Sequence, residues 1–193
     1  MISLLGFFAC TPQEEQVLDM TDILPSSDKN YDVAVTDSID DNSSVQFESL
    51  GYNASLLDKF ERRLFPDRFG PDTSCVYRLT NQEDTIYYHK WLYEDSVKVM
   101  NAFYNWIDCF GDNCKSLFLG DERNFQKEAM MILVSDSTLV YIEGGELDFK
   151  NWYTYHHNLG YDQDYNYTIE QRHRGRARWF TFEDKKKIKY EKK

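Results

Sequence analysis

Four arginines alternate with other residues in the stretch RHRGRARWF near the end of the chain. They are Arg172, Arg174, Arg176 and Arg178, and Trp179 follows the last of them. A guanidinium group can bind a carboxylate or a phosphate through two parallel hydrogen bonds. Since alternate residues of a β-strand share a face, we expect these five residues to form a surface that binds an acidic partner or an anion. The alternative is an edge hairpin whose exposed charges prevent aggregation.

A weaker pattern, DQDYN, has the residue types of a calcium-binding loop. Asp162, Asp164 and Asn166 stand at the first, third and fifth positions of such a loop, where oxygen ligands are needed. The pattern then breaks, because Tyr167 replaces the required glycine and His173 replaces the glutamate that closes the loop. We therefore expect a polar loop here, and we predict no metal and no other cofactor.

Two pairs of carboxylates have a spacing that would suit acid–base chemistry. Glu143 and Glu146 flank a double glycine, and Asp121 is followed directly by Glu122. Both pairs lie in turn-like contexts, where charged side chains are commonly just solvated. They are the nearest candidates for a general acid and base.

The histidines add little to a catalytic interpretation. His156 and His157 are adjacent, and in a strand they would point to opposite faces, which suits neither a metal chelate nor a catalytic pair. His89 is expected to pack within a strand. The sequence has no nucleophile elbow, phosphate loop, zinc-protease motif or dinucleotide-binding fingerprint. The sequence therefore favours a protein that is not an enzyme.

Helices and strands must position these residues. Apolar residues at helical spacing predict helices over residues 53–65 and 94–111. Between them, residues 75–79 and 85–93 are rich in β-branched and aromatic side chains, which predicts strands. A further short strand is expected at residues 115–120.

Two hairpins are expected after the second helix, in residues 129–145 and 165–184. Their turns would fall at Asp136–Ser137 and at Arg174–Gly175, with Gly175 supplying the second turn. Residues 148–160 fit a helix and a strand equally well. The order of elements predicts an α+β fold, in which two helices pack on one face of an antiparallel sheet of hairpins in a single domain.

The charge of the chain is unevenly distributed. The 193 residues carry a net charge of −11, and residues 11–50 account for −9 of it, with ten carboxylates and one lysine. Residues 170–193 are basic, with ten Lys or Arg and four acids. We expect residues 11–50 to be a flexible tether, residues 51–184 the globular domain and residues 185–193 a frayed basic tail. The acidity of the whole chain therefore does not exclude an anionic partner for the domain.

The chain opens with an apolar run, residues 2–9, that stops at Cys10 and is followed by the acidic segment. The run is less than half the length of about 20 residues that a membrane-spanning helix needs. It resembles the lipobox of bacterial lipoproteins, with Ala9 in the position before the cysteine. The resemblance implies that residues 1–10 are a signal-peptide remnant and that Cys10 is lipidated and anchors the protein in a membrane.

Acidic residues soon after Cys10 are also similar to the surface-export signals of lipoproteins in the Bacteroidota. No Lys or Arg precedes the apolar core, so we expect the natural start to lie upstream of Met1. The alternative to the lipobox is a short buried strand that happens to contain a cysteine.

If Cys10 carries a lipid, three cysteines remain in an oxidising compartment. A reversal that contains Gly111 separates Cys109 from Cys114, which lets the chain bring the two within disulfide distance. We predict a Cys109–Cys114 disulfide and a buried free thiol at Cys75. The alternative pairs Cys75 with one of the other two. The spacing does not fit a zinc site.

These patterns predict a lipoprotein of the bacterial cell envelope, in the outer membrane and exposed at the surface, that acts as an accessory subunit or binding module. Its expected partners are the membrane, through the lipid, and an envelope protein, with an anionic glycan or lipid A as a further candidate; nucleic acid is not expected. The alternative is a surface protein that binds or processes glycans, because aromatic residues cluster in NWYTYHH and YDQDYNY. Exposed, stacked aromatic rings would favour this alternative, whereas buried rings would fill a core.

Overall fold

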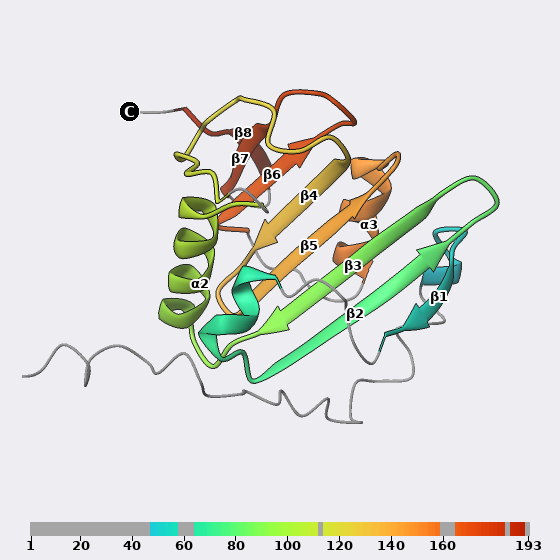
Figure 1. The fold of residues 1–193 in the computed structure, drawn as a ribbon, viewed down its shortest axis with the longest axis horizontal. Coiled ribbons are helices and arrows are strands. Elements are labelled where there is room, and N and C mark those ends of the chain that lie inside the picture. The colour runs from blue at the N-terminus through green and yellow to red at the C-terminus, as the bar shows by residue number, and fades with distance from the viewer. Residues whose placement is uncertain (1–46, 58–63, 112–113, 159–164, 184–185, 192–193) are drawn as a thin grey trace, which may run out of the picture. The chain divides into compact units, whose positions relative to one another are not determined.

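The strands form a single antiparallel sheet in the computed structural model, which describes residues 47–57, 64–111, 114–158, 165–183 and 186–191. The strands are β1 (Asn53–Leu56), β2 (Thr73–Thr80), β3 (Thr85–Leu92), β4 (Ala129–Val134), β5 (Thr138–Gly144), β6 (Tyr167–Gln171), β7 (Arg178–Glu183) and β8 (Lys186–Lys189). The helices in the described part are α2 (Ser96–Asp108), α3 (Phe149–Asn158) and the short 3₁₀ helix η2 (Phe65–Phe69). The predicted α+β class is confirmed (Figure 1).

The order of the strands in the sheet is β1-β2-β3-β5-β4-β6-β7-β8, and every neighbouring pair is antiparallel. The hairpin of β4 and β5 lies in the middle, with β5 beside β3 and β4 beside β6. Both predicted hairpins are therefore present, but they are joined with the earlier strands into one larger sheet.

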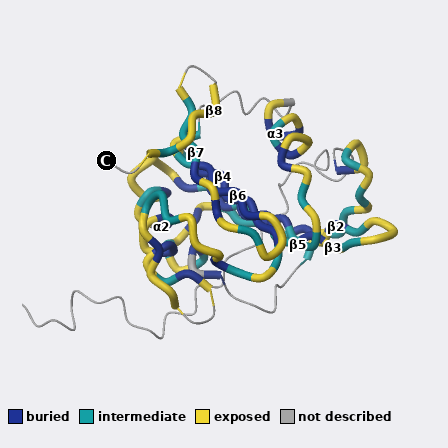
Figure 2. Tube along the Cα trace, turned by 90° about the horizontal axis from the view of Figure 1, so that it is seen from above, coloured by how far each residue is buried: buried dark blue, intermediate teal, exposed yellow. Residues whose placement is uncertain are grey.

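The two faces of the sheet are both covered. All six residues of β4 are buried, and residues 130–134 alternate between two cores. Met130, Ile132 and Val134 pack with α2, whereas Met131 and Leu133 pack on the face that α3 covers. A strand that is buried on both faces has a continuous apolar run instead of alternation. The two helices expected on one face are those of residues 53–65 and 94–111; the α-helices of the described part are instead α2 and α3, and these two lie on opposite faces of the sheet (Figure 2).

Helix α2 confirms the helix predicted within residues 94–111. Its N-terminus is capped by Asp95, whose side chain accepts a hydrogen bond from the Lys98 N–H at 2.8 Å. The helix ends at Asp108, and the predicted disulfide joins Cys109 to Cys114 directly after it. Cys75 is buried with a free thiol, so it does not pair with either of them.

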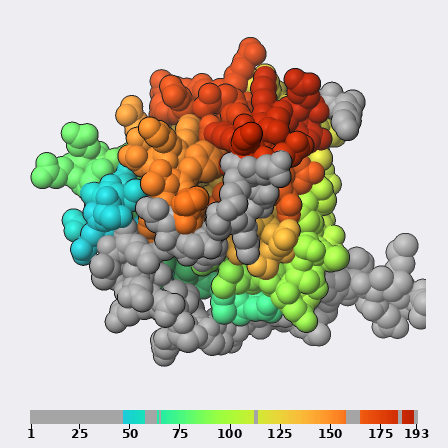
Figure 3. Space-filling model, turned by 180° about the vertical axis from the view of Figure 1, so that it is seen from behind, coloured from blue at the N-terminus to red at the C-terminus, as the bar shows by residue number. Residues whose placement is uncertain are grey.

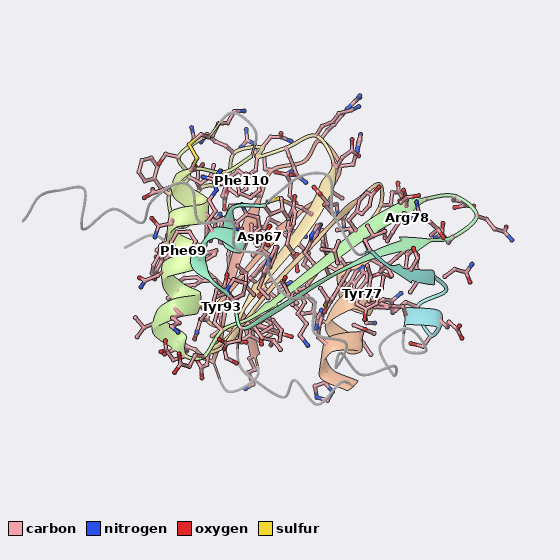
Figure 4. The ribbon with its side chains drawn as sticks, turned by 60° about the horizontal axis from the view of Figure 1, so that its bottom comes forward. Asp67, Phe69, Tyr77, Arg78, Tyr93 and Phe110 are labelled. Atoms are coloured by element: carbon pink, nitrogen blue, oxygen red, sulfur yellow. A yellow bond between two sulfur atoms is a disulfide. The ribbon has the colours of Figure 1, made fainter. Side chains whose placement is uncertain are left out.

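Helix η2 is fastened to β3 and to the chain after it by two side chains, Asp67 and Tyr93. Asp67 accepts hydrogen bonds from the Leu64 N–H at 3.0 Å and from the Trp91 indole N–H at 2.6 Å. The Tyr93 hydroxyl donates to the Pro66 carbonyl at 3.1 Å. Figure 4 shows Asp67 and Tyr93 on the side of the sheet where α2 lies.

Residues 148–160, which fit a helix and a strand equally, contain α3. Asp148 accepts hydrogen bonds from the N–H groups of Lys150 at 3.1 Å and Asn151 at 3.3 Å, which caps the first turn. The helix buries Trp152 and Tyr155 in the second core.

Phe47 completes this second core. It lies in the range expected to be a tether, yet it is 1% exposed and stacks on Tyr155 with a centroid separation of 5.1 Å. The packed part of the chain therefore includes Phe47, while residues 1–46 lie outside the described residues.

Three other expectations need correction. The helix expected over residues 53–65 is wrong for residues 53–56, which form β1, and residues 58–63 lie outside the described part. The strand expected at residues 115–120 is wrong, because only Lys115 makes a bridge, to Phe110. The tail expected to fray contains the edge strand β8, which pairs with β7. For β1 and β8, backbone pairing across the sheet overrides the local pattern, whereas residues 116–120 have no strand partner and stay irregular.

Among the described residues, no helix combines the length and the apolar character needed to cross a membrane.

Candidate functional site

The alternating arginines do not share a strand face. The register of β6 and β7 pairs Glu170 with Arg178, so the arginines before Arg178 lie in the connection between the strands, where alternation does not apply. Arg172, Arg174 and Arg176 are exposed there. Trp179 is 1% exposed, and its indole N–H donates to the Asp121 carbonyl at 2.7 Å. Trp179 is therefore a core residue and not part of a binding surface.

The turn of this connection also differs from the expected one. Arg174 has φ 52°, in the left-handed region, whereas Gly175 does not have a positive φ. The Arg174 N–H donates to the Lys127 carbonyl at 2.9 Å, and the Asn124 amide donates to the Gly175 carbonyl at 2.7 Å. These bonds to a distant segment hold Arg174 in a conformation that a local pattern would assign to glycine.

A buried carboxylate lies beneath the arginines. Glu170 on β6 is 1% exposed and points to the face that α3 covers. One oxygen accepts hydrogen bonds from the Tyr153 hydroxyl, at 2.8 Å, and from the Lys187 ammonium. The other accepts a hydrogen bond from an Arg178 guanidinium nitrogen at 3.0 Å. A buried charge is tolerated only with such partners, so α3, β7 and β8 all meet at this one side chain.

Lys187 is held by aromatic rings as well as by charge. Its ammonium nitrogen is 4.4 Å from the ring centroid of Tyr153 and 3.9 Å from that of Phe180, which is within the range of cation–π attraction. Burial lowers the pKa of Lys187, and the hydrogen bond to Glu170 opposes this shift. Burial raises the pKa of the Tyr153 phenol, and the negative charge of Glu170 raises it further. Tyr153 therefore remains a neutral hydrogen-bond donor to the carboxylate.

These residues form part of a hollow of about 800 Å³ on the α3 side of the sheet. We call it the Glu170 hollow, and it is lined by residues 145–150, 153–154, 170, 172–173, 178, 187 and 129. Its lining carries four Lys or Arg side chains, at Lys150, Arg172, Arg178 and Lys187, against three carboxylates. Figure 3 shows this side of the molecule, with α3 in orange and the last strands in red.

One wall of the hollow depends on a glycine. Asp84 accepts hydrogen bonds from the N–H groups of Glu146 and Thr85, each at 2.8 Å. A Cβ atom added at Gly145 would lie 2.3 to 2.6 Å from the carboxyl group of Asp84. The double glycine therefore lets the loop between β5 and α3 lie against Asp84, which is a structural use of the EGGE stretch.

The two candidate acid–base pairs are not brought together for catalysis. Glu143 accepts a hydrogen bond from Tyr141 at 2.7 Å on the α2 side of the sheet, whereas Glu146 lines the Glu170 hollow on the other side. Asp121 forms an ion pair with Arg123, and Glu122 forms one with Lys189 at 2.8 Å. Each member of the second pair thus binds a different cation.

The calcium pattern lies mostly outside the described residues, since Asp162 and Asp164 are among residues 159–164. Asn166 is described, and its amide donates to Asp136 at 3.2 Å. Within the described ranges, no group of three or more His, Cys, Asp or Glu side chains is placed to hold a metal ion. Cys10 also lies outside the described residues.

Two of the four histidines, His89 and His156, are core residues, whereas His157 and His173 are exposed. His89 is 1% exposed and lies 5.7 Å, between ring centroids, from both Trp91 and Tyr141. His156 is 2% exposed on α3, and its burial, together with the positive charge of Lys90, lowers its pKa to about 3. His157, next along the helix, is exposed. Because α3 is a helix, the two side chains point in different directions.

Glu170, Tyr153 and Lys187 were not among the candidates from the sequence. The available signal was a glutamate inside the strand-like stretch YTIEQ, where an acid on a buried face requires a partner. The partners lie 17 residues away on either side, at Tyr153 and Lys187, so sequence spacing does not reveal them.

Comparisons with models of protein families, with curated proteins and with solved structures found no match. The fold and the site together define an α+β protein with a basic surface connection and an ionic hollow beside it.

Proposed function

We propose that this protein is a lipid-anchored binding module of the bacterial cell envelope, which docks an acidic partner protein through its basic end. The observation that carries the proposal is the group of exposed arginines on one connection, Arg172, Arg174 and Arg176. They lie outside the paired strands and are presented to solvent together.

Hydrogen bonds to residues 123–127 hold the connection between β6 and β7 in place. The Ala177 N–H donates to the Arg123 carbonyl at 3.1 Å, in addition to the bonds that hold Arg174 and Gly175. A loop that is already ordered loses less conformational entropy when a partner binds. This supports a recognition role for the arginines over a role as mobile surface charges.

A basic residue of β8 extends the same surface. Lys189 and, to a smaller extent, Arg176 lower the pKa of Glu122, so both cations lie near this carboxylate. A positive surface of this kind favours an acidic partner and increases the rate of encounter.

The anchor in this proposal rests on the sequence alone. Lipidation at Cys10 would fix the module to a membrane, with two or more acyl chains giving stable attachment. The acidic segment after Cys10 would then act as a spacer between the membrane and the domain.

The glycan-binding alternative has less support. The chain has four tryptophans, and none is more than 3% exposed: Trp91, Trp106, Trp152 and Trp179. A stacking platform for sugar rings needs exposed aromatic faces. The tryptophans therefore serve the two cores.

The test is a pull-down of the tagged protein from gently solubilised native membranes, with mass spectrometry of the N-terminal peptide and of co-purifying proteins. We expect an acylated Cys10 and a stoichiometric partner that is lost when Arg172, Arg174 and Arg176 are all replaced by Gln. The matched control replaces three exposed basic residues elsewhere, Arg68, Arg78 and Lys98, with Gln. Equal loss of the partner in both variants would overturn the docking surface, and an unmodified Cys10 would overturn the anchor.

A further inference from the structure

The Glu170 hollow has an excess of positive charge at its floor. Glu170 carries one negative charge and is bonded to two cations, Arg178 and Lys187. The carboxylate is 2% exposed as a side chain, whereas the side chains of Arg178 and Lys187 are 48% and 31% exposed. The acid is therefore covered, and the groups that face the hollow are the cations.

The remaining charges of the lining balance one another. Arg172 and Lys150 add two cations, and Glu146 and Asp148 add two carboxylates, of which Asp148 also caps the first turn of α3. With the floor included, an anion that enters the hollow therefore meets four positive and three negative side chains.

Arg178 is suited to bind such an anion. A guanidinium group has five N–H donors in a planar fork, and the described contacts of Arg178 with Glu170 use one of its nitrogens. The bond to Glu170 fixes the plane of the fork in advance, which reduces the entropy cost of binding. Arg172, in the connection between β6 and β7, also lines the hollow and can supply a second fork.

We propose that the Glu170 hollow binds a compact oxyanion group, a phosphate or a carboxylate, with Arg172, Arg178 and Lys187 as the residues that hold it. A volume of about 800 Å³ is large enough for a small ligand that carries such a group. The inference rests on the proposed function as a binding module and names the chemistry that this module recognises. Tyr153 and Thr154 line the same space, and because their hydroxyl groups already donate to Glu170 and to the Lys150 carbonyl, they can only accept hydrogen bonds from the rest of the ligand.

The test titrates the full chain, carrying Cys10→Ser so that it stays free of lipid, with inorganic phosphate and separately with malonate. Chloride at matched ionic strength corrects for general screening. The readout is the ¹H–¹⁵N NMR spectrum, including the arginine Nε–Hε signals. We expect saturable shifts in the Arg178 side chain and in residues 145–150 and 170–173. The anion that saturates at the lower concentration identifies the preferred oxyanion.

Arg172→Gln should weaken this binding about tenfold, because it removes a charge-assisted bond from the rim. The matched control is Arg78→Gln, which removes an exposed arginine charge outside both the lining and the docking surface, and should change binding by less than about twofold. Arg178→Lys keeps a cation beside Glu170 and should also weaken binding about tenfold, because an ammonium group cannot replace the fork. If Arg178→Lys fails to fold, the comparison of Arg172→Gln with Arg78→Gln decides.

Absence of saturation with both anions, or equal weakening by Arg172→Gln and Arg78→Gln, would overturn the proposed site. This result is independent of the pull-down, because it uses purified protein without membrane or partner. Anion binding without a partner protein would retain the hollow and overturn the docking surface. A partner protein without anion binding would retain the docking surface and overturn the proposed anion site in the hollow.

Discussion

Glu170 shows how one buried charge can join three elements. Its carboxylate is bonded to Tyr153 on α3, Arg178 on β7 and Lys187 on β8, and it is almost fully covered. Ion pairs of this kind add little net stability over an apolar core, but loss of one partner leaves the others with unbalanced charge. A substitution of Glu170 should therefore destabilise the fold mainly because Arg178 and Lys187 keep their charges without the anion that balances them.

Glu170→Gln should reduce the free energy of unfolding by about 3 kcal/mol, because it leaves two cations and a buried hydroxyl without their anion. Urea denaturation followed by circular dichroism measures this change. The control is Glu146→Gln, which removes an exposed acid from the rim of the same hollow and should cost less than about 0.5 kcal/mol. Similar losses in the two variants would show that Glu170 does not carry the network.

His156 should make the fold sensitive to acid. Its pKa is lowered to about 3 by burial first and by Lys90 second, whereas the unfolded chain titrates near 6.5. Between these values the unfolded state binds a proton that the folded state does not, so stability falls as the pH falls, by about 1.4 kcal/mol per unit. This contribution is fully present above pH 6.5.

The difference in unfolding free energy between the wild type and His156→Gln should accordingly be constant above about pH 6.5 and shrink below it. His157→Gln, on the same helix but exposed, is the matched control and should leave the acid limb of the curve as in the wild type. Chemical denaturation at several pH values gives both curves. Parallel curves for the wild type and His156→Gln would contradict the assignment.

At the scale of elements, β8 is the strand whose pairing depends most on side-chain contacts. It is an edge strand of four exposed residues, paired only with β7. Short edge strands have few backbone bonds and open easily. The contacts of Lys187 with Glu170, Tyr153 and Phe180 fasten the strand from one face.

Lys187→Met should therefore increase hydrogen exchange at the amides that pair β7 with β8, because the strand loses its ionic and cation–π contacts. Lys186→Met changes the neighbouring residue, which points to the opposite face, and should leave exchange there within about twofold of the wild type. Exchange measured by mass spectrometry on peptides from residues 178–191 provides the comparison. Unchanged exchange in Lys187→Met would mean that backbone pairing alone holds β8.

The loop after α2 depends on its disulfide. Cys109 directly follows the helix, and Cys114 has a positive φ of 48°. Replacement of both cysteines by Ala should lower the free energy of unfolding by about 2 kcal/mol, as the chain-entropy account gives for so short a loop. Denaturation with and without reductant checks this: the reductant should destabilise the wild type and leave the double variant unchanged.

At the scale of the whole molecule, one sheet separates two cores. The residues of β4 and β5 contribute to both, with Ile132 and Tyr141 on the α2 side and Leu133 and Val140 on the α3 side. Because the same strands carry both cores, loss of packing on either face weakens the pairing that the other face needs. We therefore expect the described fold to unfold as one cooperative unit.

Ile132→Ala and Leu133→Ala test this cooperativity with neighbouring residues that point to opposite cores. Each is fully buried, and each substitution should cost about 2 to 5 kcal/mol. Both should shift the far-ultraviolet and near-ultraviolet circular dichroism transitions together, without separating them. Separate transitions in either variant would show that one face can unfold while the other remains folded.

The sequence by itself determined those features that depend on neighbouring residues. It predicted α2 from apolar spacing and a cap, the hairpin of β4 and β5 from strand-like runs around a turn, and the disulfide from a short reversal. The α+β class followed from the order of such elements. In each case the interacting residues are close in the chain, so their types and spacing contain the information.

Only the tertiary structure decided which faces and partners these elements have. The stretch at β1 carries a helical pattern, but pairing with β2 supplies the backbone bonds that make it a strand. Trp179 stands among arginines in the sequence, yet the fold buries it against Asp121. The Glu170 network joins residues on four elements, β6, α3, β7 and β8, and its formation depends on α3 and β8 meeting over β6, which no local pattern encodes.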